Sequence, residues 1–438
     1  MFPNPQAALP LPRRPNLERY RELAKELVKA CKSGDAAVVS EWAEKWVNML
    51  AQKSGVTFNR AVEVVAARWA RQVDAFVQRT LMREGSRCRL GDAQLVIARC
   101  HGFASWAGFS KYLKAFGQKG SGVARFESAA DAIVAGDLPK LKRLLRADPA
   151  LVRARSAREH GATLLHYVSA NGVEGYRQKT PKNIVAVAEV LLTAGAEVDA
   201  EAAVYGGGAA TLGLVATSIH PYRAGVQNEL IDILLDHGAE IDHRTSAGNR
   251  QSSVAGALAN GRGEAAAHLA ERGARLNLEA AAGVGRLDVV KRFFNNNRKP
   301  GHKRVQSAFL CACGWGRNAV VEFLLEQGGD LNDGGGDGQT PLHCAVITGQ
   351  LETVRLLLKF NPPLEATNIY GGTVLGQTLW SAAHGGEPKL FSEIVETLIA
   401  AGAKVPPRHV PVNKEIDDLL RQYGSEPEPT WYWYGEKP

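Results

Sequence analysis

Three cysteines in the second half of the chain are the first residues whose type and spacing suggest chemistry. Cys311 and Cys313 are two positions apart, and Cys344 follows Cys311 by 33 residues. Thiolates bind zinc, but a structural zinc site takes four ligands and the surrounding pattern supplies no fourth. A small thiol also packs readily in an apolar core. We therefore interpret all three as core residues and predict no metal site.

An aspartate-rich stretch, "DLNDGGGDGQT", has the composition of a calcium-binding loop. The EF-hand pattern requires a glutamate at the twelfth loop position. Counted from Asp330 that position is Pro341, and counted from Asp333 it is Cys344. Both registers lack the bidentate carboxylate, so we interpret the stretch as a glycine-rich turn.

Glycine runs and histidines are the remaining candidates for catalysis. Gly206–Gly208 and Gly334–Gly336 lack the Lys-Ser/Thr pair of a phosphate-binding loop. No nucleophile motif pairs a serine or cysteine with His166 or His343. The sequence therefore predicts a protein that is not an enzyme and takes no cofactor.

Composition and charge favour a soluble protein of two or more parts. The chain has 438 residues, 45% of them hydrophobic, and no apolar run reaches the roughly 18 residues that cross a bilayer. Its six scattered cysteines form no disulfide framework, and the proline-rich start does not have the pattern of a signal peptide, so we expect a cytoplasmic protein. Residues 1–125 hold 21 Lys and Arg against 10 Asp and Glu, a net +11, whereas the rest holds 32 against 35, a net −3. This difference predicts a basic front domain and a near-neutral body.

One phrase, "DGQTPLHCAVITGQLETVRLLLKFNPPL", has a counterpart earlier in the chain. Thr340 and Pro341 suit the cap and first position of a short helix, and Gly349 ends that helix before a second one. The stretch "SAFLCACGWGRNAVVEFLLEQGGDL" aligns 33 residues earlier without a gap, with Gly316 at the place of Gly349. Helices this short are stable only when neighbours stack on them, so the pattern predicts a repeat array.

The period, the "TPLH" at Thr340–His343 and the "TLLH" at Thr163–His166 resemble the ankyrin repeat. The resemblance covers 126–405, about seven to eight units, and implies an all-α solenoid of helix pairs joined by turn fingers. It further implies that His166 and His343 form hydrogen bonds within their turns. Insertions separate the inner and outer helices of three units, and they contain the phrases "GVEGYRQKTPKN", "IHPYRAGVQN" and "HGGEPKLFS".

The resemblance implies that binding occurs on the concave face, and the insertions supply a second candidate surface. Fingers and exposed ends of inner helices recognise partners in such arrays, and aromatic and arginine side chains are enriched where interfaces are strongest. We therefore predict a scaffold that binds a protein partner, with two alternatives left open: the tryptophans are buried by neighbouring insertions, or the inserted loops pack on one another. The candidate binding residues are Trp315, Ile347, Thr348 and Trp380 on the inner helices, and Tyr176, Arg177, His220, Tyr222, Arg223 and His384 in the insertions.

The two ends of the chain complete the predicted organisation. We expect a disordered N-terminus over 1–15, a basic helical domain over 16–120 and a tail over 406–438, which contains Trp431–Tyr434 and either caps the last repeat or docks on a partner. The helical domain resembles one that precedes the repeats in bacterial ankyrin proteins. Its stretch "IARCHGFASWAGFSKYL" also resembles a helix-turn-helix, which leaves a nucleic-acid-binding regulator as the alternative function.

Overall fold

The structure is a computed structural model that describes residues 2–12, 14–53, 60–83, 88–246, 252–295, 299–385 and 387–428. Contacts within the chain divide it into two compact units, 1–256 and 257–438. Helices predominate in both units, and the described strands form two short pairs, so the all-α class is confirmed. None of the helices in the described part combines the length and apolar character that a membrane crossing requires.

Helices α1 to α5 form an N-terminal helical module with an aromatic core. Asn16 caps α1 by accepting a hydrogen bond from the Glu18 amide at 2.9 Å. In the core, Tyr20 packs edge-on against Phe109, and the ring of His101 stacks on Phe109 with their centroids 5.2 Å apart. The helices are α1 (Leu17–Lys32), α2 (Ala36–Lys53), α3 (Arg60–Leu81), α4 (Leu90–Cys100) and α5 (Trp106–Gly117).

The sequence predicts disorder over 1–15, but residues 2–12 pack on this module. The Leu9 side chain is fully buried, and its amide donates to the Cys100 carbonyl at 2.8 Å. His101 Nδ1 lies 3.0 Å from the Leu9 carbonyl, to which it donates in the neutral tautomer. The segment includes η1 (Pro5–Ala7). It is held on the module by burial of its few apolar residues and by the backbone hydrogen bonds of Leu9.

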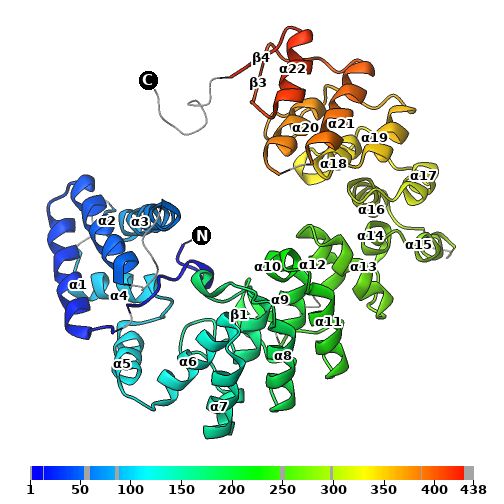
Figure 1. Cartoon of the computed structure of the whole chain (residues 1–438). Coiled ribbons are helices and arrows are strands. Elements are labelled where there is room, and N and C mark those ends of the chain that lie inside the picture. The colour runs from blue at the N-terminus through cyan, green and yellow to red at the C-terminus, as the bar shows by residue number, and fades with distance from the viewer. Residues whose placement is uncertain are drawn as a thin grey trace. The chain divides into compact units, whose positions relative to one another are not determined.

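Helix pairs continue the first unit directly after the module, so the expected separate domain 16–120 shares one unit with the first repeats. Ser121 caps α6, and Gly136 ends it in the left-handed conformation at φ 69°. The inner elements α6, η3 and α9 pack in succession, and the outer helices α8 and α11 pack on each other (Figure 1). These elements are α6 (Gly122–Ala135), α7 (Leu138–Ala147), η2 (Pro149–Arg153), η3 (Leu164–Ser169), α8 (Ile184–Thr193), α9 (Thr211–Thr217), α11 (Gln227–Asp236) and α12 (Ser253–Ala259), which reaches into the second unit.

The second unit stacks further pairs, with α14, α16, α18 and α20 as successive inner helices and α15, α17, α19 and α21 outside them. In the unit that contains the "TPLH" phrase, the Thr340 side chain caps α18, Pro341 is its first residue, and Gly349 turns the chain at φ 71°. Each of these matches the prediction. The helices are α13 (Gly263–Glu271), α14 (Leu278–Val284), α15 (Leu287–Phe294), α16 (His302–Gly314), α17 (Asn318–Glu326), α18 (Pro341–Ile347), α19 (Leu351–Leu358), α20 (Val374–Ala383) and α21 (Pro388–Ala400), with η5 (Gly335–Asp337) in a finger.

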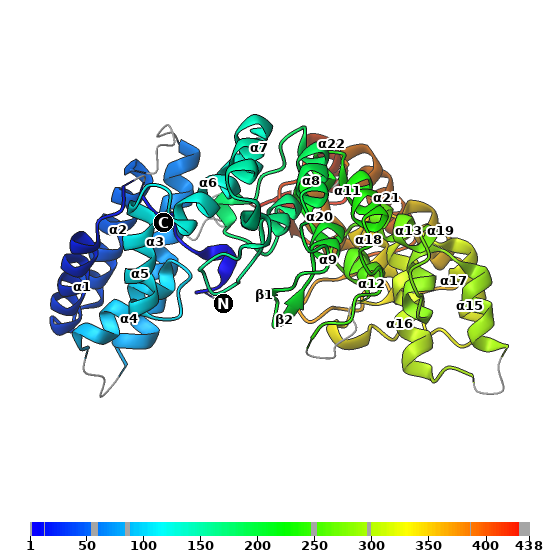
Figure 2. The same cartoon turned by 90° about the horizontal axis from the view of Figure 1, so that it is seen from below.

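The three insertions adopt different structures. The first contains η4 (Gly175–Arg177) and the second contains α10 (Ile219–Arg223), both between an inner and an outer element. The third forms no separate element, because its extra residues lengthen α20 and α21. The finger before α9 is a hairpin of β1 (Ala202–Val204) and β2 (Gly207–Ala209) that projects from the helices (Figure 2).

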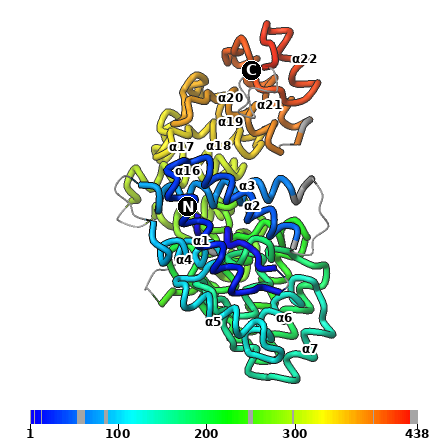
Figure 3. Tube along the Cα trace, turned by 90° about the vertical axis from the view of Figure 1, so that its left-hand side faces the viewer, coloured from blue at the N-terminus to red at the C-terminus, as the bar shows by residue number. Residues whose placement is uncertain are grey.

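One more helix covers the end of the second unit. Ile416 and Leu420 of α22 (Lys414–Gln422) are fully buried, and α22 packs on α21 (Figure 3). The strands β3 (Arg408–His409) and β4 (Glu426–Pro427) pair in parallel beside it. A terminal repeat needs such a cover because its apolar face otherwise meets water. Trp431–Tyr434, which either cap the last repeat or dock on a partner in the prediction, lie outside the described residues.

Candidate functional site

The turn histidines are structural. His343 Nδ1 lies 2.8 Å from the Thr340 hydroxyl, and its Nε2 lies 3.2 Å from the carbonyl of Gly372 in the next finger. His166 repeats the arrangement, with Nδ1 at 2.8 Å from the Thr163 hydroxyl and Nε2 at 3.2 Å from the carbonyl of Ala209. Burial lowers the pKa of both imidazoles, to about 4 for His166. The implied hydrogen bonds are present, and they also tie each turn to its neighbour.

The predicted inner-helix positions lie on an uncharged surface of the second unit. Ile347 at the end of α18 is 36% exposed, Thr348 is exposed beside it, and Trp380 on the adjacent α20 is 50% exposed. Neither α18 nor α20 contains an Asp, Glu, Lys or Arg, whereas the outer helix α19 carries Glu352 and Arg355. The inner face of these two helices therefore offers apolar contact without charge, which is how the centres of protein interfaces differ from ordinary surface.

Trp315 differs from Trp380, because its ring is partly covered by packing within the unit. A Cβ added to Gly263 would lie 2.3 Å from Cζ3 of Trp315, so the indole rests directly on the backbone at the start of α13. The Thr348 hydroxyl donates to the Gly314 carbonyl at 2.5 Å and ties α18 to α16 at the same place. Trp315 therefore contributes mainly to stacking of the repeats, and Trp380 is the more exposed of the two predicted anchors.

Trp380 is held by its neighbour His384. The two rings stack at 4.2 Å between centroids with 17° between their planes, and His384 Nδ1 lies 2.7 Å from the Trp380 carbonyl. A second aromatic residue, Tyr370, is 82% exposed in the finger before α20, where the neighbouring Ile369 amide donates to the Asp337 carbonyl. Tyr370 is not among the binding residues predicted from the sequence.

Arg177, a candidate binding residue of the first insertion, is buried, which agrees with the alternative that the insertions pack internally. Its side chain is 6% exposed and belongs with Glu127, Arg158 and Glu174 to a set termed here the buried ion cluster. Arg177 Nη1 lies 2.6 Å from Glu127 Oε2 and 3.6 Å from Glu174 Oε1, and its Nη2 donates to Asp131 at 2.7 Å. The guanidinium thus fastens the first insertion to α6.

Arg158 provides the second centre of the cluster. Its side chain is 1% exposed and pairs with Glu174 through Nε, and its Nη1 donates to the His101 carbonyl at 3.1 Å. Its Nη2 donates to the Tyr176 hydroxyl at 3.0 Å, so the predicted contact residue Tyr176 is also engaged internally. Through these contacts the insertion and the first finger are joined to the helical module.

The pKa shifts follow from these pairings. Burial alone would raise the pKa of Glu174, but Arg158, His160 and Arg177 together hold it well below its usual range. Burial outweighs the nearby guanidinium of Arg158 and raises the pKa of Tyr176 to about 12. Both Glu174 oxygens and Arg177 Nη1 lack an aligned hydrogen-bond partner among the described residues, so charge attraction rather than hydrogen-bond geometry dominates here.

The second insertion remains at the surface of the first unit. Tyr222 is 40% exposed, Arg223 is exposed, and His220 is partly buried. Burial lowers the pKa of His220, with a smaller contribution from Arg223. The arginine of the first insertion, Arg177, turns inward instead, so the described structure does not gather the residues of these two insertions into one exposed cluster.

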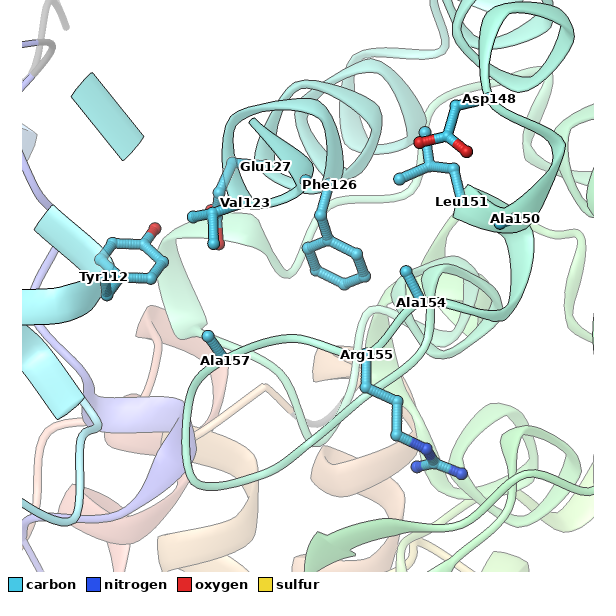
Figure 4. A pocket seen from close by; sticks show the side chains of 11 residues that line it. Tyr112, Val123, Phe126, Glu127, Asp148, Ala150, Leu151, Ala154, Arg155 and Ala157 are labelled. Carbon is cyan, nitrogen blue, oxygen red and sulfur yellow. The ribbon is translucent and has the colours of Figure 1, made fainter. Parts of the chain in front are cut away.

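A cavity of about 240 Å³ adjoins the buried ion cluster (Figure 4). Glu127 and Tyr112 line one end, and the side chains of Phe126, Leu151 and Ala154 line the other. No short stretch of the sequence indicates this site, because its walls come from α5, α6, η2 and the loop after it.

The helix-turn-helix resemblance corresponds to α4 and α5. Phe109, Tyr112 and Leu113 of α5 are buried against neighbouring helices, and the exposed side of α5 presents Lys111 and Lys114 as its cationic residues. No Arg, Asn or Gln on α5 is available to read base edges. This surface suits phosphate attraction more than sequence recognition, so the structure gives the nucleic-acid alternative no specific support.

Helix pairs with this finger geometry define an all-helical array that contains ankyrin repeats. Residues 278–368 match the family model for ankyrin repeats in three copies. The chain is 31% identical over 119 residues to BCL-6 corepressor-like protein 1 of Homo sapiens, and 31% identical over 108 residues to RelA-associated inhibitor of Mus musculus. These alignments cover 26% and 23% of this chain but 6% and 13% of the two relatives. The repeats and these likenesses support a role in protein interaction and a non-enzymatic module.

Proposed function

We propose that the inner face of the second unit binds a protein partner, with Trp380 and Ile347 as its apolar anchors. The supporting observation is the uncharged, exposed surface of α18 and α20, because charged residues are common on the outer helices and absent from these two. Tryptophan contributes large contact area at small cost in side-chain entropy, which favours it at interface centres. Stacking on His384 holds the Trp380 ring before a partner arrives.

The bound segment that fits this surface is apolar and uncharged at its centre. A charged residue placed on α18 and α20 would lose water without gaining a counter-charge from either helix. The exposed Tyr370 of the adjacent finger adds an amphipathic contact at the rim. The second insertion, with Tyr222 and Arg223 exposed on α10, is a separate candidate surface in the first unit.

Other features of the chain extend this proposal. All six cysteines are free thiols, which suits a protein of a reducing, cytoplasmic compartment. The helical module in front of the repeats supports the bacterial type of ankyrin protein. No catalytic step is required of the residues on α18 and α20.

A site-directed photo-crosslinking experiment tests the proposal. The full chain carries benzoylphenylalanine either at Ile347 on the inner face or at Glu352, an exposed position on the outer helix α19. We expect a defined crosslinked protein from position 347 and none from 352. The captured protein is then purified, and its affinity is measured against the unmodified chain and the Trp380→Ala variant.

Loss of a central tryptophan anchor is expected to weaken binding by roughly thirtyfold or more. A Tyr222→Ala variant, altered on the separate surface of α10, serves as the control. The proposal is contradicted if the same protein crosslinks equally from both positions, or if Trp380→Ala leaves its affinity unchanged.

A further inference from the structure

Two cysteines of the helical module share one cleft. Cys31 lies in the last turn of α1, and Cys88 comes two residues before the start of α4 at Leu90. The two thiols form a side-chain hydrogen bond with each other. Both line a cleft of about 770 Å³, in which Cys31 is 8% exposed and Cys88 is partly exposed. Because α1 packs on α4, the fold brings together two thiols from distant parts of the sequence.

The lining of this cleft is cationic. Lys32, Arg83 and Arg89 all line it, and all three residues are exposed. No Asp or Glu is among the described residues that line it. Asp92, in the first turn of α4, accepts a hydrogen bond from the Arg89 amide at 3.0 Å and acts on the Cys88 thiol from outside the lining. An anionic reagent is therefore attracted toward the two thiols, and a cationic reagent is repelled.

We propose that Cys31 and Cys88 form a modification site, which reacts with anionic low-molecular-weight disulfides and closes into a reversible disulfide bond. In the first step Cys88 Sγ bonds to one sulfur of the reagent, and the other half of the reagent leaves as a thiol that takes the Cys88 proton. In the second step Cys31 Sγ attacks Cys88 Sγ, and the remaining half leaves as a second thiol with the Cys31 proton. The two cysteines are oxidised, and the reagent is reduced to two thiols. This site is independent of the protein-binding surface on α18 and α20.

Exposure and hydrogen bonding determine the order of the two steps. Cys88 is the more exposed thiol, and its hydrogen bond with Cys31 lowers the pKa of Cys88 while it raises the pKa of Cys31. Burial is the larger effect and raises the pKa of both thiols, to about 12 for Cys31. Cys88 therefore supplies the attacking thiolate, and Cys31 resolves the mixed disulfide. Because both pKa values are raised, the reaction is slow at neutral pH and faster as the pH rises.

Closing the bond requires little rearrangement. Hydrogen-bonded sulfurs are already neighbours, and Cys88 precedes Arg89, the N-cap of α4, so its backbone can adjust without breaking a helical hydrogen bond. The bond would tie the end of α1 to the start of α4 and enclose α2 and α3 in a covalent loop. Such a loop restricts the unfolded chain and so stabilises the helical module.

The three cysteines of the second unit differ from this pair. Cys311 and Cys344 lie on the neighbouring inner helices α16 and α18, and Cys313 is fully buried. In the part of the chain that the structure describes, none of their sulfurs is hydrogen-bonded to another, and the Cys344 thiol instead donates to the Gln339 carbonyl at 3.7 Å. These thiols therefore serve as an internal control in the same chain.

Oxidised glutathione is the probe, applied at millimolar concentration to the full, reduced chain. Free thiols are blocked with N-ethylmaleimide after increasing times, and proteolytic peptides are analysed by mass spectrometry. We expect a transient glutathione adduct at Cys88, followed by a peptide pair in which Cys88 is joined to Cys31 with the loss of two hydrogen atoms. The cysteines of the second unit should stay reduced, and dithiothreitol should restore both thiols of the cleft.

Matched variants separate the two steps. Cys31→Ala should accumulate the glutathione adduct at Cys88, because no second thiol resolves it. Cys88→Ala should give neither the adduct nor the intramolecular bond. Cys100→Ala, at a fully buried cysteine that does not line the cleft, should react like the unaltered chain.

Reagent charge tests the cationic lining. The rates with oxidised glutathione and with cystamine, a cationic disulfide, are measured for the unaltered chain and for Arg89→Gln. The intrinsic reactivity of each reagent cancels when the ratio of the two rates is compared between proteins. Arg89→Gln should lower the ratio of glutathione to cystamine rates by about fivefold at low ionic strength, the effect of one unit charge near the thiols. Arg71→Gln, at an exposed arginine of α3 outside the cleft, should leave the ratio unchanged.

Several outcomes would overturn the assignment. If Cys31 and Cys88 stay reduced in millimolar oxidised glutathione, or if the cysteines of the second unit are oxidised as fast, the cleft is not a modification site. A lasting adduct at Cys88 in the unaltered chain, without the intramolecular bond, would contradict the closing step. An unchanged ratio of rates in Arg89→Gln would show that the cationic lining does not select the reagent.

Discussion

Replacement of Arg177 by methionine is expected to destabilise the first unit strongly. The substitution keeps an apolar stem but leaves Glu127 with Arg158, at 3.8 Å, as its described cationic neighbour. Glu127 and Glu174 are 4% and 0% exposed, so neither carboxylate can recover its hydration without unfolding the site. Removing one partner of a buried ion pair costs about 3–5 kcal/mol, because the other charge is left uncompensated. We expect a loss within that range.

An ion pair at the surface with the same distance between nitrogen and oxygen provides the matched control. Arg355 Nη1 lies 2.6 Å from Glu352, the distance that also separates Arg177 from Glu127, but the two side chains are 48% and 70% exposed. Water compensates exposed charges, so Arg355→Met should cost less than about 1 kcal/mol. The comparison therefore varies burial while holding the contact distance constant.

Hydrogen exchange followed by mass spectrometry at increasing urea is the suitable assay. The chain has two units, so a single unfolding curve would mix their transitions. Peptides from α6 and the first insertion report on the first unit, and peptides from α18 and α19 report on the second. Equal losses for Arg177→Met and Arg355→Met, or a loss below about 1 kcal/mol for the former, would refute the reasoning.

Three further predictions concern packing and pH. Burial lowers the pKa of His101 to about 3. Below about pH 6.5 the unfolded chain therefore binds a proton at His101 that the folded chain does not, so His101 by itself should lower the free energy of unfolding of the first unit by about 1.4 kcal/mol per pH unit between pH 6.5 and 3. His101→Gln should reduce the pH slope by that amount, as measured by hydrogen exchange in peptides of α1 and α4. Leu9→Ala should lower the free energy of unfolding of the first unit by about 2–5 kcal/mol, because it leaves a cavity under the N-terminal segment. Hydrogen exchange in peptides of α4 measures this loss, and a loss near zero would show that 2–12 does not contribute to the core. Gly263→Ala should destabilise the second unit by about 1–3 kcal/mol because its Cβ meets the Trp315 ring. Gly213→Ala in α9, which has open space around it, should be neutral or stabilising for the first unit. Hydrogen exchange in peptides of α13 and α9 measures each unit separately, and the same sign for both substitutions would contradict the packing.

The repeat architecture was predictable because its signals are local. Thr340, Pro341 and Gly349 act through the backbone of their own turn, and the 33-residue spacing repeats this chemistry in the neighbouring unit. The same alignment placed Trp380 at an inner-helix position and left open whether its ring is exposed or buried, and in the structure it is 50% exposed. Trp315 occupies an equivalent surface, but its environment depends on Gly263, a contact that the alignment does not contain.

The residues that sequence reasoning misplaced or missed depend on distant partners. Arg177 meets Asp131 across 46 positions of the chain, and His101 meets the Leu9 carbonyl across 92. An arginine in a polar insertion is ordinarily exposed, and a short proline-rich start is ordinarily disordered. The local sequence therefore gave no reason to expect that Arg177 or the N-terminal segment is buried. Glu127, Arg158 and Glu174 carried no signal at all, because nothing in the local sequence indicates that these charges meet.

We expect the buried ion cluster to specify the arrangement of the first unit more than it adds to its stability. Well-packed apolar residues in the same places would be about as stable, so the charges contribute selectivity. Each guanidinium lies close to one carboxylate of α6, Glu127, and to one carboxylate of the first insertion, Glu174. A shift of the insertion by one residue would leave a buried charge without its partner, at a cost of several kcal/mol. The insertion therefore has one low-energy position, in which Glu127 and Glu174 share the two guanidinium groups.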